Sequence, residues 1–161
     1  MTDFESFLRR YEEMVYTTAI RLLGREAEAQ DVSQEAFLKA FENFAMLERS
    51  ESAGGWLKTV TTNLCLNHLT RHRARWTNFS ELESEAPLQI AEPAPKDASD
   101  SGLEAALAAL PDPQRVPLVL FHFEELSYED IAAKLGVPLS KVKSDIFRGR
   151  EALRRALGEE A

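Results

Sequence analysis

The last helix-like stretch of the chain gathers side chains that can bind phosphate. Residues 131–157 hold seven Lys or Arg and two acids, whereas the 161-residue chain has a formal net charge of −8. Cations repeated at helical spacing share one face, and an acidic protein that concentrates them there usually presents that face to nucleic acid. The alternative is an ordinary solvated amphipathic helix at the end of a small bundle. The polar side chains of this face are Lys141, Lys143, Ser144, Arg148, Arg150, Arg154 and Arg155.

The surrounding pattern is that of a helix, a tight turn and a second helix. Ser127 can cap the first helix with Asp130 as its capping-box partner, and Gly136, followed by Val137 and Pro138, ends it in a turn. The second helix carries the cations on one side and an apolar stripe on the other. This arrangement predicts a helix-turn-helix, which places its second helix in the major groove of DNA. The stripe consists of Val142, Ile146, Gly149, Leu153 and Leu157.

The middle of the chain separates two regions of different composition. Residues 80–102 contain three prolines, six acids and one lysine without a helical or strand period, which predicts a solvated linker. The linker accounts for most of the net negative charge, so the overall acidity does not exclude nucleic acid. Elsewhere apolar residues recur with a helical period, and no segment alternates long enough for a strand. We therefore predict an all-α protein of two small helical domains, residues 1–79 and 103–161, joined by an acidic, proline-containing linker.

Helical periods predict elements in both domains. In the first domain, one helix ends at Gly24, a second spans about 26–44 and a third spans about 56–75. In the second domain, a helix from about 116 to 125 with Pro117 in its first turn precedes the helix-turn-helix. The second helix of the first domain presents a group of polar side chains opposite its apolar stripe. These side chains could accept hydrogen bonds from arginines of another protein, or they could form an ordinary solvated helix face. This polar group consists of Asp31, Gln34 and Glu35.

The chain has neither a long apolar segment nor a pair of cysteines. It lacks a run of eighteen apolar residues and a secretory pattern at its start, so we expect a cytoplasmic protein without membrane insertion. Cys65 is the only cysteine, which excludes an internal disulfide. Cys65, His68 and His72 recur at helical spacing, but a fourth ligand is missing and the neighbouring Arg71 and Arg73 disfavour a cation. We therefore expect no metal and no other cofactor.

Three motifs, in a fixed order, resemble a known family. They are DVSQEAFLKAF at 31–41, GWLKTVTTNLCLNHL at 55–69, and the stretch at 107–157 that contains the helix-turn-helix. Their order and spacing resemble the extracytoplasmic function (ECF) group of bacterial RNA polymerase sigma factors in the sigma-70 family, which retain only sigma regions 2 and 4. The resemblance implies that the chain binds core RNA polymerase and promoter DNA, that an anti-sigma factor is a further partner, and that the chain is a monomer when free.

For the first motif, the resemblance implies contact with the polymerase itself. Asp31, Gln34 and Glu35 would bind the clamp helices of the largest polymerase subunit. Ser33 stands where the family usually has an aliphatic residue. We therefore expect loose packing beneath this helix.

For the second motif, the resemblance implies a site for the minus 10 promoter element. The loop 45–52 would capture an unpaired base, Asn63 would contact the same element, and basic side chains would follow the phosphates of the separated strand. Thr59 and Thr62 stand where relatives often carry arginine, which removes two expected cations. Trp56 is interpreted as a core residue in preference to a wedge between the strands. The residues assigned to this site are Met46, Leu47, Lys58, Asn63, Asn67, Arg71, Arg73 and Arg75, with His72 as a further phosphate contact.

For the third motif, the resemblance implies that the helix after Pro138 reads the minus 35 element in the major groove. Asp145 departs from the family, in which arginine is common at this position. A carboxylate repels phosphate, so Asp145 either changes the sequence that is read, for example by accepting a hydrogen bond from cytosine N4, or weakens the contact. The base-reading candidates are Ser140, Lys141, Lys143 and Ser144, and Arg148 and Arg150 are expected on phosphates.

The function predicted from these features is that of an ECF-type sigma factor that directs promoter-specific transcription initiation. The alternative is a free-standing helix-turn-helix regulator with an N-terminal sensing or dimerisation bundle, which would leave the polar group at Asp31 without a use. An enzyme is not expected. The sequence offers no histidine paired with a nucleophile, no metal-binding carboxylate cluster and no glycine loop that cradles phosphate.

Overall fold

A computed structural model of the chain describes residues 3–72 and 102–158, and it divides into two compact units, Met1–His72 and Arg73–Ala161. The regular elements in the described residues are all helices, which confirms the predicted all-α class. No helix among them has both the length and the apolar character needed to cross a membrane. The predictions for the linker before Gly102, for the phosphate contacts Arg73 and Arg75 and for the side chain of His72 concern positions outside the described residues.

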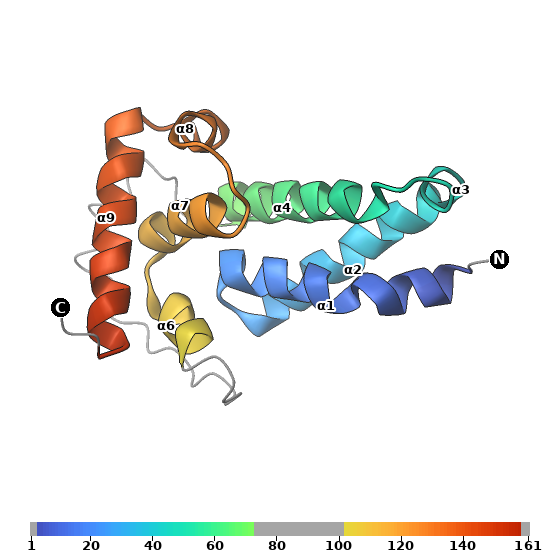
Figure 1. Ribbon diagram of the computed structural model, residues 1–161, viewed down its shortest axis with the longest axis horizontal. Helices are drawn as coiled ribbons and strands as arrows, with labels where there is room; N and C mark the ends of the chain where they lie inside the picture. Colours follow the sequence, from blue (N-terminus) through green and yellow to red (C-terminus); the bar gives the residue numbers. More distant parts are fainter. Residues whose placement is uncertain (1–2, 73–101, 159–161) are drawn as a thin grey trace. The chain divides into compact units, whose positions relative to one another are not determined.

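The first unit is built from α1 (Phe4–Leu23), α2 (Glu26–Glu42), α3 (Phe44–Leu47) and α4 (Ala53–His72), coloured blue to green in Figure 1. The three long helices each contact the other two. The first predicted helix ends as expected, because Gly24 adopts a left-handed conformation with φ of 72° and donates its N–H to Ile20 O at 2.8 Å.

The second predicted helix is interrupted before its expected end. Asn43 leaves the helical conformation, with φ of −110° and ψ of 18°, and its Nδ2 donates to Lys39 O at 2.8 Å. An asparagine side chain that bonds a backbone carbonyl in this way competes with helix continuation. The helix therefore ends at Glu42, and the segment predicted as an irregular loop begins with the single turn of α3.

The core of the first unit lies between α1, α2 and α4. It includes Phe7, Val15, Ala36, Ala40 and Leu57, with Trp56 packed against it, which agrees with Trp56 as a core residue. Along α4, Val60 and Leu64 are only partly buried. The remaining buried positions of α4 are Ala53, Thr61, Thr62, Cys65, Leu66 and Leu69.

The second unit is built from α6 (Leu103–Ala109), α7 (Asp112–His122), α8 (Tyr128–Leu135) and α9 (Leu139–Ala156), coloured yellow to red in Figure 1. Helix α7 contacts both α8 and α9. It begins four residues before the predicted start, so Pro117 lies inside it rather than in its first turn.

A buried arginine explains the early start of α7. Arg115 pairs with the carboxylate of Asp112 in the first turn, and its Nη1 donates to Leu110 O at 2.7 Å, just before the helix. These contacts hold the residues on both sides of Pro111 in place. Because Arg115 is charged, its burial and its local contacts cannot be predicted from the spacing of apolar residues.

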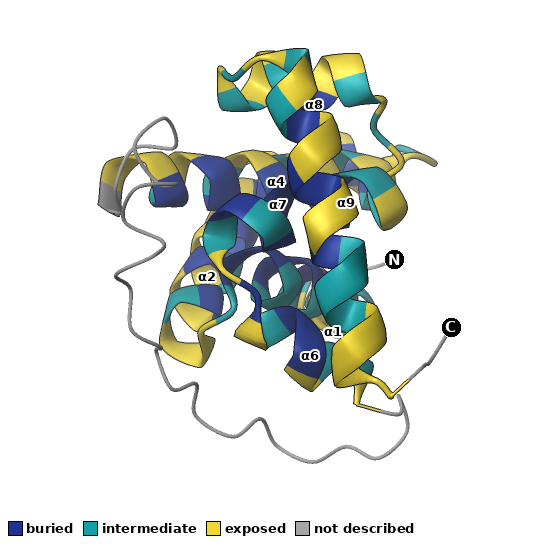
Figure 2. Ribbon diagram, turned by 90° about the vertical axis from the view of Figure 1, so that its left-hand side faces the viewer, coloured by how far each residue is buried: buried dark blue, intermediate teal, exposed yellow. Residues whose placement is uncertain are grey.

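The helix-turn-helix forms as predicted from α8 and α9. Ser127 Oγ accepts the N–H of Asp130 at 3.0 Å, and Gly136 ends α8 with φ of 70°. Along α9, the buried residues Val142, Ile146 and Gly149 face the other helices, and Figure 2 shows dark blue bands alternating with yellow along this helix. Leu153 is partly buried and Leu157 is exposed, so the predicted stripe is buried only in its first part.

Close contact between α7 and α9 depends on a glycine. A Cβ at Gly149 would lie 2.9 Å from Leu118 Cδ1 and 3.3 Å from Gln114 O. The absence of a side chain at this position therefore allows α9 to lie directly against α7. This packing fixes which face of α9 remains exposed.

Candidate nucleic-acid and protein interfaces

The exposed face of α9 begins in its first turn and continues for more than two turns. Ser140, Lys143, Ser144, Phe147 and Arg148 are exposed and lie opposite the buried stripe. Their spacing of i, i+3, i+4, i+7 and i+8 places them on one side of the helix. This side combines hydroxyl groups, cations and one aromatic ring, and it contains four of the predicted minus 35 residues.

Asp145, Lys141 and Arg148 form an ion-pair group beside that face. Asp145 Oδ2 lies 2.7 Å from Lys141 Nζ, and Oδ1 lies 3.6 Å from Arg148 Nη1. Asp145 is only 7% exposed. The carboxylate is therefore not presented to a base, which disfavours a hydrogen bond to cytosine N4 and leaves a weakened contact as the other predicted alternative. Lys141 is expected to read bases, but its side chain is half-buried and its ammonium group is bonded to this carboxylate.

Arg150 is also engaged within its own domain. Its guanidinium carbon lies 5.8 Å from the centre of the Phe121 ring, and its Nε donates a hydrogen bond of 3.1 Å to Nε2 of His122. Partial burial lowers the pKa of His122, and the charge of Arg150 lowers it further, so the imidazole remains a neutral acceptor. The expected phosphate contact is thus a link between α7 and α9.

The outer face of α4 carries part of the predicted minus 10 site. Asn63, Asn67 and Arg71 are exposed and lie along one side of the helix, in line with Thr59. Lys58 is half-buried and lies about 140° around the helix from Asn63, because successive residues turn by about 100°. The structure thus brings three of these candidates together and places Lys58 on another side.

The predicted base-capturing loop has one exposed and one buried candidate. Met46 in α3 is 49% exposed, whereas Leu47 is 2% exposed and belongs to the core of the first unit. Leu47 is therefore corrected from a DNA contact to a core residue that anchors α3. The turn that follows is closed by Ser50, whose Oγ accepts the N–H of Ser52 at 3.0 Å.

Three residues of α4 are either buried or in contact with a neighbouring helix. They are Thr62, Cys65 and His68. Thr62 is buried, so this position of α4 packs inward, and a longer cation there would have to leave the core. Cys65 is buried too, and His68 Nε2 lies 3.2 Å from Glu28 Oε1 on α2. Burial of Cys65 and the contact of His68 with α2 give these two residues a structural role in the first unit.

The polar group of α2 is exposed as predicted. Asp31, Gln34 and Glu35 all lie on the outer side of the helix, with Val32 and Ala36 buried beneath them. Gln34 also lines a groove of about 850 Å³ between α1 and α2. The predicted polar group is therefore one border of a larger surface.

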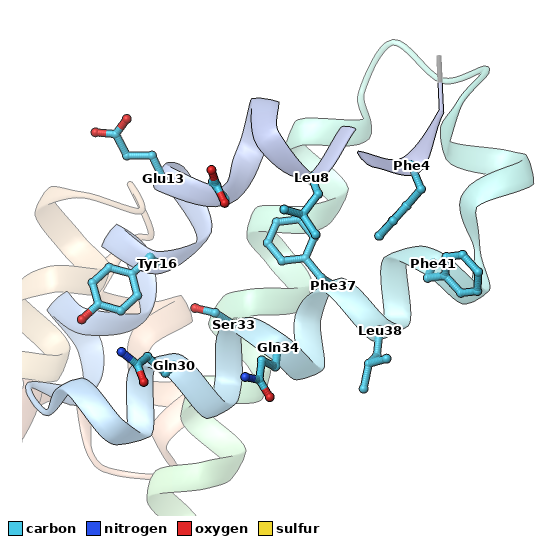
Figure 3. A pocket seen from close by; sticks show the side chains of 11 residues that line it. Phe4, Leu8, Glu13, Tyr16, Gln30, Ser33, Gln34, Phe37, Leu38 and Phe41 are labelled. Atoms are coloured by element: carbon cyan, nitrogen blue, oxygen red, sulfur yellow. The ribbon is translucent and has the colours of Figure 1, made fainter. Parts of the chain in front are cut away.

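The groove has an apolar floor and a partly acidic border, and Figure 3 shows its side chains. Leu38 and Phe41 extend it along α2, and each is 62% exposed. Ser33 also lines it, and in the described part of the chain its Oγ is buried without a hydrogen-bond partner. The other lining residues are Phe4, Leu8, Glu12, Glu13, Tyr16, Gln30, Gln34 and Phe37.

Comparison with protein families assigns both units. The family described as "Sigma-70 region 2" matches residues 7–75, and the family described as "Sigma-70, region 4" matches residues 101–153. The ECF RNA polymerase sigma factor SigM of Mycobacterium tuberculosis is 31% identical, with 96% of this chain and 77% of that protein covered. The chain belongs to the ECF sigma factor family.

Other ECF sigma factors are also similar in sequence over nearly the whole of this chain. SigE of Mycolicibacterium smegmatis is 35% identical over 99% of this chain, which spans 63% of the length of that relative. SigW of Bacillus subtilis is 29% identical over 96% of this chain and 88% of that protein. The solved structure of the sigma factor RpoE of Bartonella quintana, in complex with the anti-sigma factor NepR, has the same fold, with a TM-score of 0.56, 22% identity and full coverage of both chains.

Membership in the sigma factor family decides between the two functions that the sequence left open. A free-standing regulator gives no reason for a sigma region 2 before the helix-turn-helix, whereas an ECF sigma factor requires both regions in this order. In this sigma factor, α1 to α4 belong to region 2 and α6 to α9 belong to region 4.

Three apolar residues of the two sigma regions are exposed but are not among the candidate residues that the sequence predicts. They are Leu38, Phe41 and Phe147. The signal for Leu38 was available, because it falls off the buried stripe of Val32, Ala36 and Ala40. Phe147 was recognisable in the same way, since it lies outside the stripe of Val142 and Ile146.

Proposed function

We propose that this sigma factor binds core RNA polymerase through its first unit and directs the polymerase to promoters that both units recognise. The observation that carries the proposal is the match to region 2 and region 4 in one chain, in the order that a promoter-recognition factor needs. The chain itself then requires no catalytic group, because the polymerase performs the chemistry. We also propose the boundaries 1–79, 80–102 and 103–161 for region 2, linker and region 4.

The proposed polymerase contact is the surface formed by the polar group of α2 and the neighbouring groove. Asp31, Gln34 and Glu35 supply acceptors for arginine side chains, and Leu38 and Phe41 supply exposed apolar area beside them. Stable protein interfaces combine an apolar centre with a polar border. By family resemblance, the partner surface is the clamp helices of the largest polymerase subunit.

The proposed minus 10 contact lies on α3 and the outer side of α4. Met46 is exposed next to the α3–α4 turn, and Asn63, Asn67 and Arg71 follow on one face. Amide groups can hydrogen-bond the edges of unpaired bases, and the arginine can bind the phosphates of the separated strand. This division of roles accounts for DNA opening without a reactive group.

The proposed minus 35 contact is the exposed face of α9. Ser140, Lys143 and Ser144 would lie nearest the base edges, because the N-terminal residues of a recognition helix enter the groove. Arg148 would bind a phosphate. We add Phe147, which is 60% exposed in the middle of this face and can contact the methyl group of a thymine.

Regulation and location follow from the same proposal. The relative from Bartonella quintana was solved with an anti-sigma factor, and we propose that a protein of that class also regulates this chain. The chain would act in the cytoplasm, where the polymerase and the chromosome are, and would be a monomer when it is bound to neither partner.

Reconstituted transcription tests the proposal. Full-length chain and bacterial core RNA polymerase are combined with templates selected from a randomised promoter library, and run-off transcripts are measured. We expect transcripts only when both proteins are present, with loss on scrambling of either promoter element. Transcripts that are equal without the chain would contradict the proposal.

A further inference from the structure

Asp145 and Arg115 are the two buried charged residues in the described part of the second unit, and only the carboxylate of Asp145 lies on α9. It lies in the second turn of α9, is almost fully buried, and has one cation at each oxygen, Lys141 at 2.7 Å and Arg148 at 3.6 Å. A carboxylate removed from water is costly unless it is paired, so this burial favours keeping a cation beside it. Lys141 supplies that cation.

The two cations are held to different degrees. The Lys141 side chain is 24% exposed and lies on the flank of α9, between the exposed face and the buried stripe, whereas the Arg148 side chain is 62% exposed. At 3.6 Å, Arg148 is attracted to the carboxylate but can still reach outward. Asp145 therefore holds the ammonium group of Lys141 in place, whereas it only attracts the guanidinium group of Arg148.

An ordinary stabilising role does not account for this arrangement. A lysine that precedes an acid at i, i+4 is the weaker order of a helical ion pair, and such pairs contribute only about 0.2–0.5 kcal/mol even in the better order. An apolar side chain at this buried position would fill the same space without the cost of a buried charge. The carboxylate has a clear effect only on the cations beside it.

We propose that Asp145 is a positioning residue for promoter recognition, which keeps Lys141 away from DNA phosphates and so limits the binding of α9 to DNA of any sequence. The inference rests on the proposed function, since it concerns the same minus 35 contact. Phosphate contacts add affinity without sequence information, whereas groups on base edges provide selectivity. Keeping Lys141 from the phosphates lowers the affinity for DNA of every sequence. Contacts of Ser140, Ser144 and Phe147 with bases then make up a larger part of the binding free energy, so α9 distinguishes better between sequences.

The test uses the full chain assembled with core RNA polymerase. Dissociation constants are measured at 50 and 200 mM salt, on a promoter and on the same DNA with a scrambled minus 35 element. The variants are Asp145→Asn, Lys141→Gln, and the two combined. Lys143→Gln serves as the matched control, because Lys143 is an exposed lysine of the same helix without an ion pair to Asp145.

Release of Lys141 adds about one phosphate contact, and each contact steepens the salt dependence of log K by about 0.9. For Asp145→Asn, we therefore expect the ratio of affinities at the two salt concentrations to rise about threefold on both DNAs. The preference for the intact minus 35 element should fall. In the Lys141→Gln background, Asp145→Asn should have much less effect. Lys141→Gln alone should change the salt dependence and the preference little, whereas Lys143→Gln, which removes a proposed base contact, should reduce the preference for the intact minus 35 element.

A second measurement on the unaltered chain covers the case in which Asp145→Asn fails to fold. Amine acylation followed by mass spectrometry should modify Lys141 more slowly than Lys143. Equal acylation rates, or a folded Asp145→Asn variant with unchanged salt dependence, would overturn the inference. If such a result accompanies promoter-dependent run-off transcription by the unaltered chain, the proposed function stands and only the role of Asp145 fails; without that transcription, the proposed function fails.

Discussion

At the scale of single residues, the second unit uses part of its cationic charge internally. Lys141 binds Asp145, and Arg150 bonds His122 and lies over Phe121. Counting cations in the sequence therefore overstates what α9 can offer to phosphate. The side chains that remain on the outer face are fewer, and one of them is aromatic.

Phe147 provides a residue-scale prediction about thymine. Replacement of thymine by deoxyuridine in the minus 35 element removes one methyl group, whose burial contributes about 0.8 kcal/mol. We expect this replacement at the contacted position to weaken binding of the wild-type holoenzyme by about fourfold and to have little effect on Phe147→Ala. Equal losses for both proteins at every thymine would show that the ring does not contact a methyl group.

His122 provides a prediction about pH. Its pKa is lowered from 6.5 by burial and by Arg150, so the unfolded chain binds a proton at a higher pH than the folded chain does. The contribution of His122 to stability is therefore present above pH 6.5 and is lost as the pH falls from there through the lowered pKa. Thermal denaturation between pH 7.5 and 5.5 should show a smaller loss of stability for His122→Gln, which cannot be protonated but can accept the bond from Arg150. His68→Gln, in the other unit, is the control and should keep the wild-type response of the second unit.

At the scale of elements, most helices were predictable and their ends less so. Gly24 and Gly136 end helices through a backbone conformation that the residue type itself favours, and Ser127 caps α8 through its own hydroxyl group. The break at Asn43 and the early start of α7 depend instead on contacts with other groups, in the second case those of Arg115. Hydrophobic periods do not record such contacts.

The proposed interfaces, like the helix ends, were only partly predictable from the sequence. The exposure of Asp31, Gln34 and Glu35 was predictable because helical spacing alone sets them opposite the buried stripe. The groove beside them was not, because it depends on how α1 lies against α2. Likewise, the burial of Asp145 and Leu47 results from the packing of neighbouring helices, which residue type alone does not reveal.

Gly149 gives an element-scale prediction about the placement of the recognition helix. A valine there would overlap Leu118 and press on Gln114 O, which lies 3.3 Å from the position of a Cβ. We expect Gly149→Val to lower the free energy of unfolding of the second unit by about 1–3 kcal/mol. Ser144→Val places the same side chain on the exposed face of α9 and should cost much less. Denaturant unfolding distinguishes the two, and similar losses for both variants would show that packing against α7 does not set the effect, since valine is a better helix former than glycine.

The surface of α2 gives a further prediction at this scale. Leu38→Ser combined with Phe41→Ser should change stability little, because both side chains are exposed, but should weaken core polymerase binding by roughly 2 kcal/mol, about thirtyfold. Lys39→Ser, an exposed neighbour, is the control. Titration with labelled chain measures the affinity. Unchanged binding of the double variant would remove these side chains from the proposed interface.

At the scale of the whole molecule, the function depends on two units that act on one DNA. In the proposed function, region 4 supplies a helix for the major groove, and region 2 supplies a polymerase contact together with amide and arginine groups for the opened strand. Neither unit alone explains promoter opening. Promoter opening therefore requires the chain and the polymerase to act together at the same promoter.

Permanganate reactivity of promoter thymines tests that requirement most directly, because it detects unpaired bases. With the full chain and core RNA polymerase together, we expect reactive thymines within the minus 10 element, and we expect Asn63→Ala to slow their appearance while leaving core binding near normal. Neither protein alone should produce them. Equal reactivity with core polymerase alone, or a promoter that the two proteins occupy together without any unpaired thymine, would contradict the assignment of promoter opening to this sigma factor.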